Sequence, residues 1–148
     1  MAGKIVVDTS VLIKWIKTRD EGLVKEARRL LDAIEKARLE VAVPALLFYE
    51  VGNILLTKTR LSPEDLARAM DDLSVFPLVV ADPRAELLRR TARLGRELNL
   101  TFYDASFLAL AEELDCNFVT ADRRFYEAAA RLPRVRHLSN VGNIGRAV

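Results

Sequence analysis

Short apolar runs alternate along the chain with longer segments in which apolar residues recur at helical spacing. Most of the runs are too uniformly apolar for strands with one face in water, and they are typical of a parallel sheet that is covered on both faces. We therefore predict strands at Lys4–Asp8, Leu39–Val43, Leu78–Ala81, Asn117–Thr120 and Val135–Leu138.

The segments between these runs predict helices. An apolar stripe predicts one from Leu23 to Ile34, and proline or capping signals predict helix starts at Pro44, Ser62-Pro63 and Asp82-Pro83. Two more helices are expected at Phe102–Leu114 and Arg123–Arg131. The alternation predicts a three-layer α/β domain, in which a central parallel sheet of about five strands is flanked by helices.

A chain of 148 residues fits a single domain over residues 1–148, with a core from about 4 to 139. The tail at 140–148 is poorly patterned, and we expect it to be flexible or to contact a partner. No apolar run approaches the roughly 18 residues of a membrane helix, and no secretory leader is evident, so a cytoplasmic protein is expected. Glutamine is absent and Met and Cys are scarce, which is typical of a thermophile.

Composition excludes several kinds of site. The single cysteine, Cys116, excludes an internal disulfide and a multi-cysteine zinc site, and we expect it to act as a small buried hydrophobe. The single histidine, His137, excludes a nuclease that uses two histidines without metal, and a place at the edge of the sheet is expected for it. The glycine-rich phosphate-binding motifs and the nucleophile elbow of serine hydrolases are also missing.

Four acidic residues follow strands or lie at the start of helices. Asp8 and Asp122 come at or just past strand ends, Glu50 lies in the helix after the second strand, and Asp104 opens the helix of TFYDASFLALAEEL. Each one singly also fits a structural role, since Asp is common as a helix cap. Because ligands gather beyond the carboxyl ends of parallel strands, we expect the four side chains to meet.

Four neighbouring carboxylates would repel one another, and a divalent cation would remove that conflict. Ligation by oxygen alone favours Mg²⁺ or Mn²⁺ over zinc. Such an ion lowers the pKa of a bound water and contacts a phosphate oxygen. The sequence therefore predicts a metal site, with Asp8 as a metal ligand.

Three stretches carry a resemblance to a known family: IVVDTSVLI, PALLFYEVGNIL and TFYDASFLALAEELDCNFVTADRRF. In this order they resemble the PIN-domain ribonucleases, and within them the VapC-type toxins of prokaryotic toxin–antitoxin pairs. The resemblance runs from Lys4 to about Ser139. It implies Mg²⁺- or Mn²⁺-dependent cleavage of single-stranded or looped RNA, leaving 5′-phosphate and 3′-hydroxyl ends. It also implies homodimers and inhibition by a small antitoxin.

Carried over residue by residue, the resemblance matches the four acids of the family to Asp8, Glu50, Asp104 and Asp122, as catalytic residues and metal ligands. It also implies that neighbouring hydroxyl groups orient the acids, namely those of Thr9, Ser10 and Thr120.

RNA contacts are predicted less directly, from basic residues near the acids: Lys14, Arg123 and Arg124. Arg89, Arg93 and Arg96 share a helix face, and a solvated face paired with Glu86 and Glu97 accounts for them equally well. Apolar residues after Pro44 and Pro63, among them Leu61, Leu66 and Met70, fit either core packing or contact with a second copy or an antitoxin helix.

Two alternatives remain at this point. A PIN nuclease that processes RNA or cuts structured DNA, without being a toxin, would carry the same acids. A phosphate-accepting receiver domain also places acids at strand ends with Mg²⁺. It needs two adjacent acids after the first strand and a lysine at a later strand end, whereas Asp8 is followed by Thr-Ser and no predicted strand ends in lysine.

Overall fold

The computed structural model describes residues 2–17, 19 and 21–146. Within these residues a five-stranded, all-parallel sheet has the strand order β3-β2-β1-β4-β5. The strands are β1 (Gly3–Val7), β2 (Leu39–Pro44), β3 (Leu78–Ala81), β4 (Asn117–Thr120) and β5 (Val135–His137). The helices are α1 (Thr9–Ile16), α2 (Val24–Glu35), α3 (Leu46–Lys58), α4 (Pro63–Ser74), α5 (Ala85–Leu98), α6 (Phe102–Glu113), α7 (Arg123–Ala129) and the 3₁₀ segment η1 (Leu138–Arg146).

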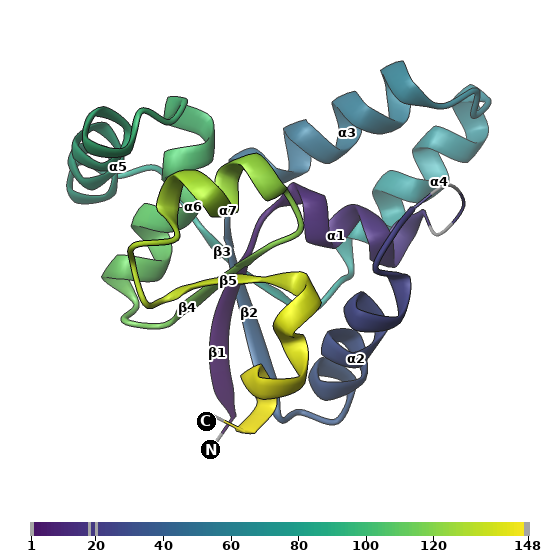
Figure 1. Cartoon of the computed structure of the whole chain (residues 1–148). Coiled ribbons are helices and arrows are strands. Elements are labelled where there is room, and N and C mark those ends of the chain that lie inside the picture. The colour runs from purple at the N-terminus through teal and green to yellow at the C-terminus, as the bar shows by residue number, and fades with distance from the viewer. Residues whose placement is uncertain (1, 18, 20, 147–148) are drawn as a thin grey trace.

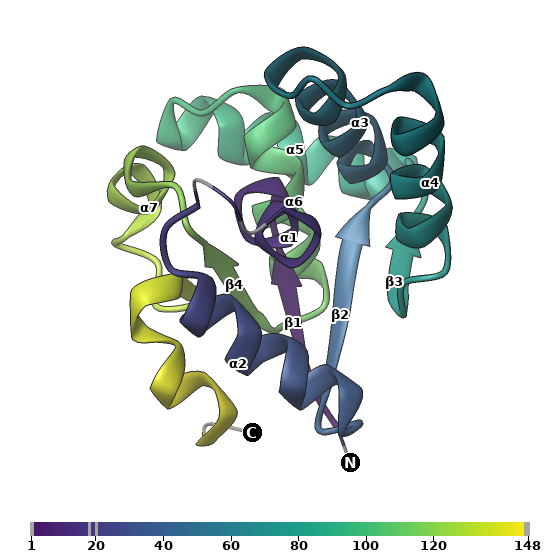
Figure 2. The ribbon, with the colours of Figure 1, turned by 90° about the vertical axis from the view of Figure 1, so that its right-hand side faces the viewer.

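Helices cover both faces of the sheet, which confirms the predicted three-layer α/β fold (Figures 1 and 2). Figure 2 shows α1 and α2 in front of the strands and α6 behind them, with α5 packed on α6. The core comes mainly from the central strands and from α6, where Phe107, Leu108 and Leu110 are almost fully buried. Burial on both faces explains why the central strands read as continuous apolar runs.

The edge strand β3 departs from that pattern. Val79 and Val80 are 46% and 42% exposed, so the expectation that uniformly apolar strands are covered is wrong here. Within the described residues, β3 lies at the edge of the sheet and is hydrogen-bonded to β2 alone.

Two predicted helix starts also need correction. Pro44 is the last residue of β2, where it pairs in register with Ala81, and α3 begins at Leu46 without a side-chain cap. Asp82 does not cap α5, whose N-cap is Arg84. By contrast, Ser62 caps α4 as predicted, with its hydroxyl accepting from the backbone N–H of Asp65 at 3.1 Å.

The tail after β5 forms η1, which packs against α2 and buries Val141. The prediction of a flexible or partner-contacting tail covers residues 140–148, of which 147 and 148 lie outside the described residues. Among the described residues, no helix is long and apolar enough to cross a membrane.

The strand order places a site at the carboxyl end of β1. β1 lies between β2 and β4, and its two neighbours lead into α3 and α7, so the chain connections diverge there. Such a switch point is where ligands bind in open parallel sheets.

Candidate active site

Asp8 lies where β1 ends and α1 begins, and its side chain is 6% exposed. Its Oδ1 accepts a hydrogen bond from Ser10 Oγ at 2.5 Å, and its Oδ2 accepts one from Thr120 Oγ1 at 2.6 Å. The backbone N–H of Val11 also donates to Oδ1 at 3.4 Å, so Asp8 caps α1. The structural and the functional interpretations of this residue are thus compatible.

The hydroxyl groups of Ser10 and Thr120 link the ends of β1 and β4. Ser10 Oγ accepts from the backbone N–H of Ala121 at 2.9 Å, while Thr120 Oγ1 accepts from that of Asp122 at 3.0 Å. Each hydroxyl therefore donates to Asp8 and accepts from the backbone that leads into α7. This arrangement fixes both oxygens of Asp8 relative to the start of α7, as expected for residues that orient an acid.

Glu50 lies in the second turn of α3 and contacts the residue that follows Asp8. Its Oε1 accepts a hydrogen bond from Thr9 Oγ1 at 2.9 Å, and this contact joins α3 to the first residue of α1. Glu50 is half-buried, whereas its neighbour Tyr49 is 78% exposed, because the helix turns the two side chains in different directions.

Asp104 and Asp122 lie at the N-termini of α6 and α7. Thr101 caps α6 by accepting from the backbone N–H of Asp104 at 3.0 Å. Asp122 is itself the cap of α7, with Oδ1 accepting from the backbone N–H groups of Arg124 and Phe125 at 2.9 and 3.2 Å. Asp104 is half-buried and Asp122 is exposed.

The four acids are close enough to influence one another electrostatically. Burial raises the pKa of Asp8 from 3.8 to about 6, the hydrogen bonds from Ser10, Thr120 and Val11 oppose this rise, and repulsion from Asp104 adds to it. Burial, again with repulsion from Asp104, raises the pKa of Glu50. The pKa of Asp104 is raised by its own burial and then by repulsion from Asp122. Asp104 therefore links the other three acids.

No lysine or arginine among the described residues forms an ion pair with any of the four acids. In the same part of the chain, no three Asp, Glu, His or Cys side chains are close enough together to hold a metal ion jointly. The donor set still fits Mg²⁺ or Mn²⁺: it consists of carboxylate oxygens, and Mg²⁺ is usually held by one or two carboxylates and several waters.

The predicted RNA-binding residues have different surroundings. Lys14 lies in the last turn of α1, largely buried, with Nζ 3.5 Å from Glu21 Oε1. Arg123 and Arg124 are exposed beside Asp122, and the guanidinium of Arg123 lies 5.8 Å from the centre of the Tyr126 ring. Only the two arginines are thus exposed beside the acids.

Other sequence predictions are resolved by the packing. Arg89 pairs with Glu86, and Arg93 pairs with Glu97, as the solvated-face interpretation predicts. His137 lies on the edge strand β5 as predicted, yet it is 3% exposed, and its Nε2 has no hydrogen-bond partner among the described residues. Cys116 is only half-buried.

Sequence reasoning missed two features near the acids. It did not predict α1, the helix that begins directly after Asp8. It also did not single out Thr101, which caps α6. The spacing Thr101-x-x-Asp104 is a capping signal that was available in the sequence.

Comparison with known proteins agrees with this fold. The PIN domain model matches residues 5–131. Exonuclease VapC9 of Pyrobaculum aerophilum is 38% identical over 92 residues, which cover 60% of this chain and 66% of that protein. Ribonuclease VapC3 of the same organism is 29% identical over 128 residues, covering 84% of this chain and 93% of that protein.

Among solved structures, a toxin–antitoxin complex from Klebsiella pneumoniae aligns with a TM-score of 0.67 and 19% identity, covering 90% of this chain and 97% of that one. At this identity the likeness concerns the fold. The family match covers most of the chain, so this protein belongs to the PIN domain family, and it is related to the VapC proteins. The receiver-domain alternative is thereby excluded.

Proposed function

We propose that this chain is a VapC-like endoribonuclease that hydrolyses phosphodiester bonds in single-stranded or looped RNA with the help of Mg²⁺ or Mn²⁺. The observation that supports it is that Asp104 lies near enough to Asp8, Glu50 and Asp122 for electrostatic repulsion to act between it and each of them. The four acids come from separate parts of the chain, and none has a basic partner among the described residues. Buried like charges are costly, and a site that gathers them is suited to a cation.

In this proposal the four acids are the catalytic residues and hold the cation, with Asp8 and Asp104 as direct ligands. When bound, the ion supplies Lewis acidity toward the phosphate and lowers the pKa of water. Thr9, Ser10 and Thr120 act as positioning residues, because their hydroxyls donate to Glu50 or Asp8. By holding both oxygens of Asp8, Ser10 and Thr120 favour its ionised form, which is the form able to bind a cation.

Cleavage of circular and linear RNA tests the reaction. The purified protein should cut a circular single-stranded RNA in the presence of Mg²⁺, leave 5′-phosphate ends, and stop when a chelator is added. A circular substrate has no end, so its cleavage separates an endonuclease from an exonuclease. If only linear RNA is degraded from its ends, or if a chelator has no effect, the proposal fails in that part.

We also propose that a small antitoxin inhibits the protein and that the protein forms homodimers in the cytoplasm. The antitoxin is supported by the likeness to a toxin–antitoxin complex. The homodimer is supported by an apolar pocket of about 300 Å³ between α3, α5 and α6, bordered by large exposed side chains. These are Tyr49, Leu88, Phe102 and Tyr103. One surface thus offers both a cavity and aromatic side chains able to fill it, as a twofold interface requires.

Light scattering tests the homodimer. Wild type should have twice the mass of the chain, and Leu88→Glu should be monomeric with an unchanged circular dichroism spectrum. A dimer that persists in the variant would contradict this surface.

A PIN nuclease for RNA processing or structured DNA remains the alternative, with the same acids. Expression in a host without the antitoxin distinguishes the two. A toxin should arrest growth, and Asp8→Ala should relieve the arrest, whereas a processing enzyme should be tolerated.

A further inference from the structure

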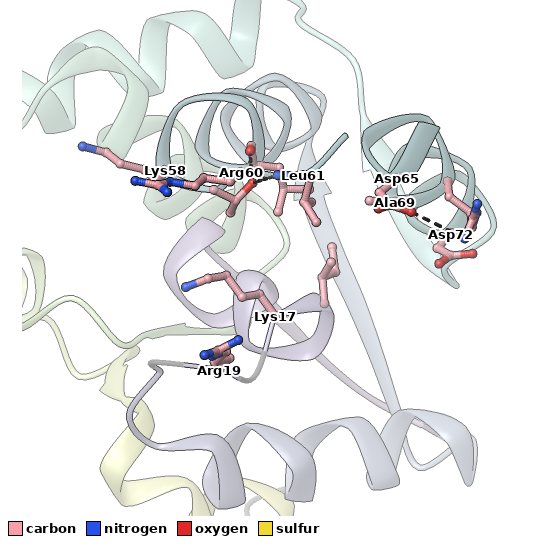
Figure 3. A pocket seen from close by; sticks show the side chains of 12 residues that line it. Lys17, Arg19, Lys58, Arg60, Leu61, Asp65, Ala69 and Asp72 are labelled. Carbon is pink, nitrogen blue, oxygen red and sulfur yellow. Dashed lines mark hydrogen bonds and ion pairs between the residues drawn. The ribbon is translucent and has the colours of Figure 1, made fainter. Parts of the chain in front are cut away.

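A second, chemically different pocket lies at the far ends of α1 and α3. It has a volume of about 860 Å³ and is lined by residues at the C-terminal ends of these helices and by residues along α4 (Figure 3). We call it the basic pocket after the basic residues that line it: Lys17, Arg19, Lys58, Arg60 and Arg68. Apolar side chains also line it, among them Ile16, Leu55 and Leu61.

Among the described residues that line the basic pocket, basic side chains outnumber acidic ones. The acids in this described lining are Asp65 and Asp72, and Arg68 already pairs with Asp65 at 3.5 Å. Figure 3 shows the nitrogen ends of Lys17, Arg19, Lys58 and Arg60 on one side of the pocket, while Asp65 and Asp72 lie across from them on α4. Among the described residues, Lys17, Lys58 and Arg60 form no ion pair.

The same two helices connect the basic pocket to the acids. α1 begins beside Asp8, α3 carries Glu50 near its start, and the hydrogen bond from Thr9 to Glu50 holds these ends together. Lys17 follows Thr9 by eight positions, as Lys58 follows Glu50. At the helical rise of 1.5 Å per residue, the basic ends lie about 12 Å from the acidic ends along both helices.

We propose that the basic pocket is a second substrate subsite, which binds backbone phosphates of the RNA strand a few nucleotides away from the bond that is cut. The inference rests on the proposed function, and it adds where the strand runs: along α1 and α3 from the acids to the basic pocket. Phosphates in one stacked strand follow one another at about 3.4 Å along the axis. The span of about 12 Å therefore corresponds to roughly three phosphates, or fewer in an extended strand.

The composition of the basic pocket suits a nucleotide. Lys58 and Arg60 form no ion pair with the part of the chain that the structure describes, and phosphates would supply the missing negative charge. Arginine forks also match phosphate geometry. The apolar side chains of the lining offer contact to ribose and base faces. Lys58, in the last turn of α3, also compensates the helix dipole, but Lys17 and Arg60 lie beyond the last residues of their helices. The competing occupant is an acidic, amphipathic segment of a protein partner.

RNA binding by charge-reversed variants tests this inference. The variant Lys58→Glu/Arg60→Glu reverses two positive charges in the basic pocket. The matched control, Lys36→Glu/Arg38→Glu, makes the same two changes at the same spacing in the sequence. Its residues are exposed and lie beside the opposite end of the sheet. Anisotropy of a labelled single-stranded RNA is measured with a chelator present, so that binding is followed without cleavage. A second RNA is trimmed to one nucleotide on each side of the mapped cleavage site. The neutral pair Lys58→Gln/Arg60→Gln serves if the reversed pair does not fold.

Reversal at the basic pocket should weaken binding of the long RNA at least tenfold. It should also lower the slope of log affinity against log salt by about 0.7 for each lost phosphate contact. The pocket variant should cut the trimmed RNA at the wild-type rate. The control variant should bind the long RNA with the affinity of wild type. Three results would overturn the proposal. Both variants could weaken binding of the long RNA equally, or the pocket variant could lose as much activity on the trimmed RNA as on the long one. The pocket variant could also bind the long RNA as tightly as wild type. Unchanged RNA binding with loss of binding to the antitoxin would assign the basic pocket to the protein partner. If wild type binds RNA through the basic pocket without cutting it, the proposed reaction fails while this subsite stands.

Discussion

Two regions of this molecule are rich in charged residues, but opposite charges are paired in one region and like charges lie near one another in the other. On the outer face of α5 and α6, arginines form ion pairs with glutamates. Arg84 pairs with Glu113 through both terminal guanidinium nitrogens, Nη1 and Nη2. Glu112 pairs with Arg90 and Arg93 at 3.0 and 2.5 Å. At the acidic centre, formed by Asp8, Glu50, Asp104 and Asp122, Asp104 interacts with three charges of its own sign. The donors that contact these acids within the described part of the chain are hydroxyl and backbone N–H groups.

The pKa shifts express the same difference. The hydrogen bond from Arg84 lowers the pKa of Glu113, whereas burial and mutual repulsion raise the pKa values of Asp8, Glu50 and Asp104. Paired surface charges contribute little and require no ligand. Like charges that are brought together and left unpaired lower stability, and proteins retain such arrangements mainly at functional sites. The presence or absence of an oppositely charged partner therefore indicates a functional site better than the number of charged residues does.

The largest expected effect is on catalysis. Asp8→Asn and Asp104→Asn should each lower the rate of RNA cleavage by about 100-fold or more, which is typical of removing one electrostatic group from a catalytic site. Single-turnover cleavage with saturating Mg²⁺ measures it, and circular dichroism checks the fold. If either variant cuts RNA as fast as wild type, the acidic centre is no more important for catalysis than the paired charges on α5 and α6.

The next effect concerns the residues that position the acids. Thr120→Val removes the donor to Asp8 and should weaken binding of Mn²⁺ by about 10- to 100-fold, as loss of a hydrogen bond to a metal ligand commonly does. The matched control is Thr91→Val: Thr91 is equally buried, but its hydroxyl donates to the carbonyl of Leu87 on α5. If both substitutions weaken Mn²⁺ binding alike, the role of Thr120 is only structural.

Stability in the absence of metal should reveal the cost of burying the charged Asp8 carboxylate, to which repulsion from Asp104 adds. Because the pKa of Asp8 is raised in the folded state to about 6, the folded protein takes up a proton more readily than the unfolded chain, and its stability falls as pH rises from about 4 to 6. Asp8→Asn should therefore raise the free energy of unfolding by up to about 3 kcal/mol at pH 7.5 in chelator, with no gain near pH 3.5. Urea denaturation at the two pH values measures it.

The opposite sign is expected on the paired face. The pKa of Glu113 is lowered, so Glu113→Gln should reduce stability at neutral pH and lose this effect in acid. A stability gain in Glu113→Gln, or none in Asp8→Asn, would contradict the contrast between the two regions.

The smallest effect belongs to the outer helices. Glu112→Gln should change the free energy of unfolding by no more than about 1 kcal/mol and leave RNA cleavage unchanged, because its pairs with Arg90 and Arg93 are partly exposed to solvent. The same denaturation and cleavage assays apply. A loss of activity would mean that this face takes part in the function.

The sheet could be predicted closely from sequence, and its surroundings less well. β3 and β4 have the predicted bounds, β2 and β5 differ from prediction by one residue at one end, and β1 is shifted by one residue at both ends. Uniform burial makes such strands conspicuous. α1 was missed because TSVLIKWI is short and rich in β-branched residues, which favour strands locally, whereas the cap from Asp8 and packing against α2 make it a helix.

The acids were identifiable because each lies at a strand end or a helix start, positions that topology brings together. Their hydrogen bonds were not, since Thr9 and Glu50 are 41 positions apart and Ser10 and Thr120 are 110 apart. The basic pocket escaped notice for the same reason: Lys17 and Lys58 become neighbours only when α1 and α3 pack. Lys14, although closer to Asp8 in sequence, is occupied by Glu21.

Titration with Mn²⁺ tests the central claim most directly. Calorimetry of wild type and of Asp104→Asn at pH 7.5 should show saturable binding in wild type, weakened at least tenfold in the variant, since Asp104 interacts with the other three acids. Binding to wild type should also weaken below about pH 6, where Asp8 becomes protonated. Absence of saturable binding, or equal binding by the two proteins, would contradict the account.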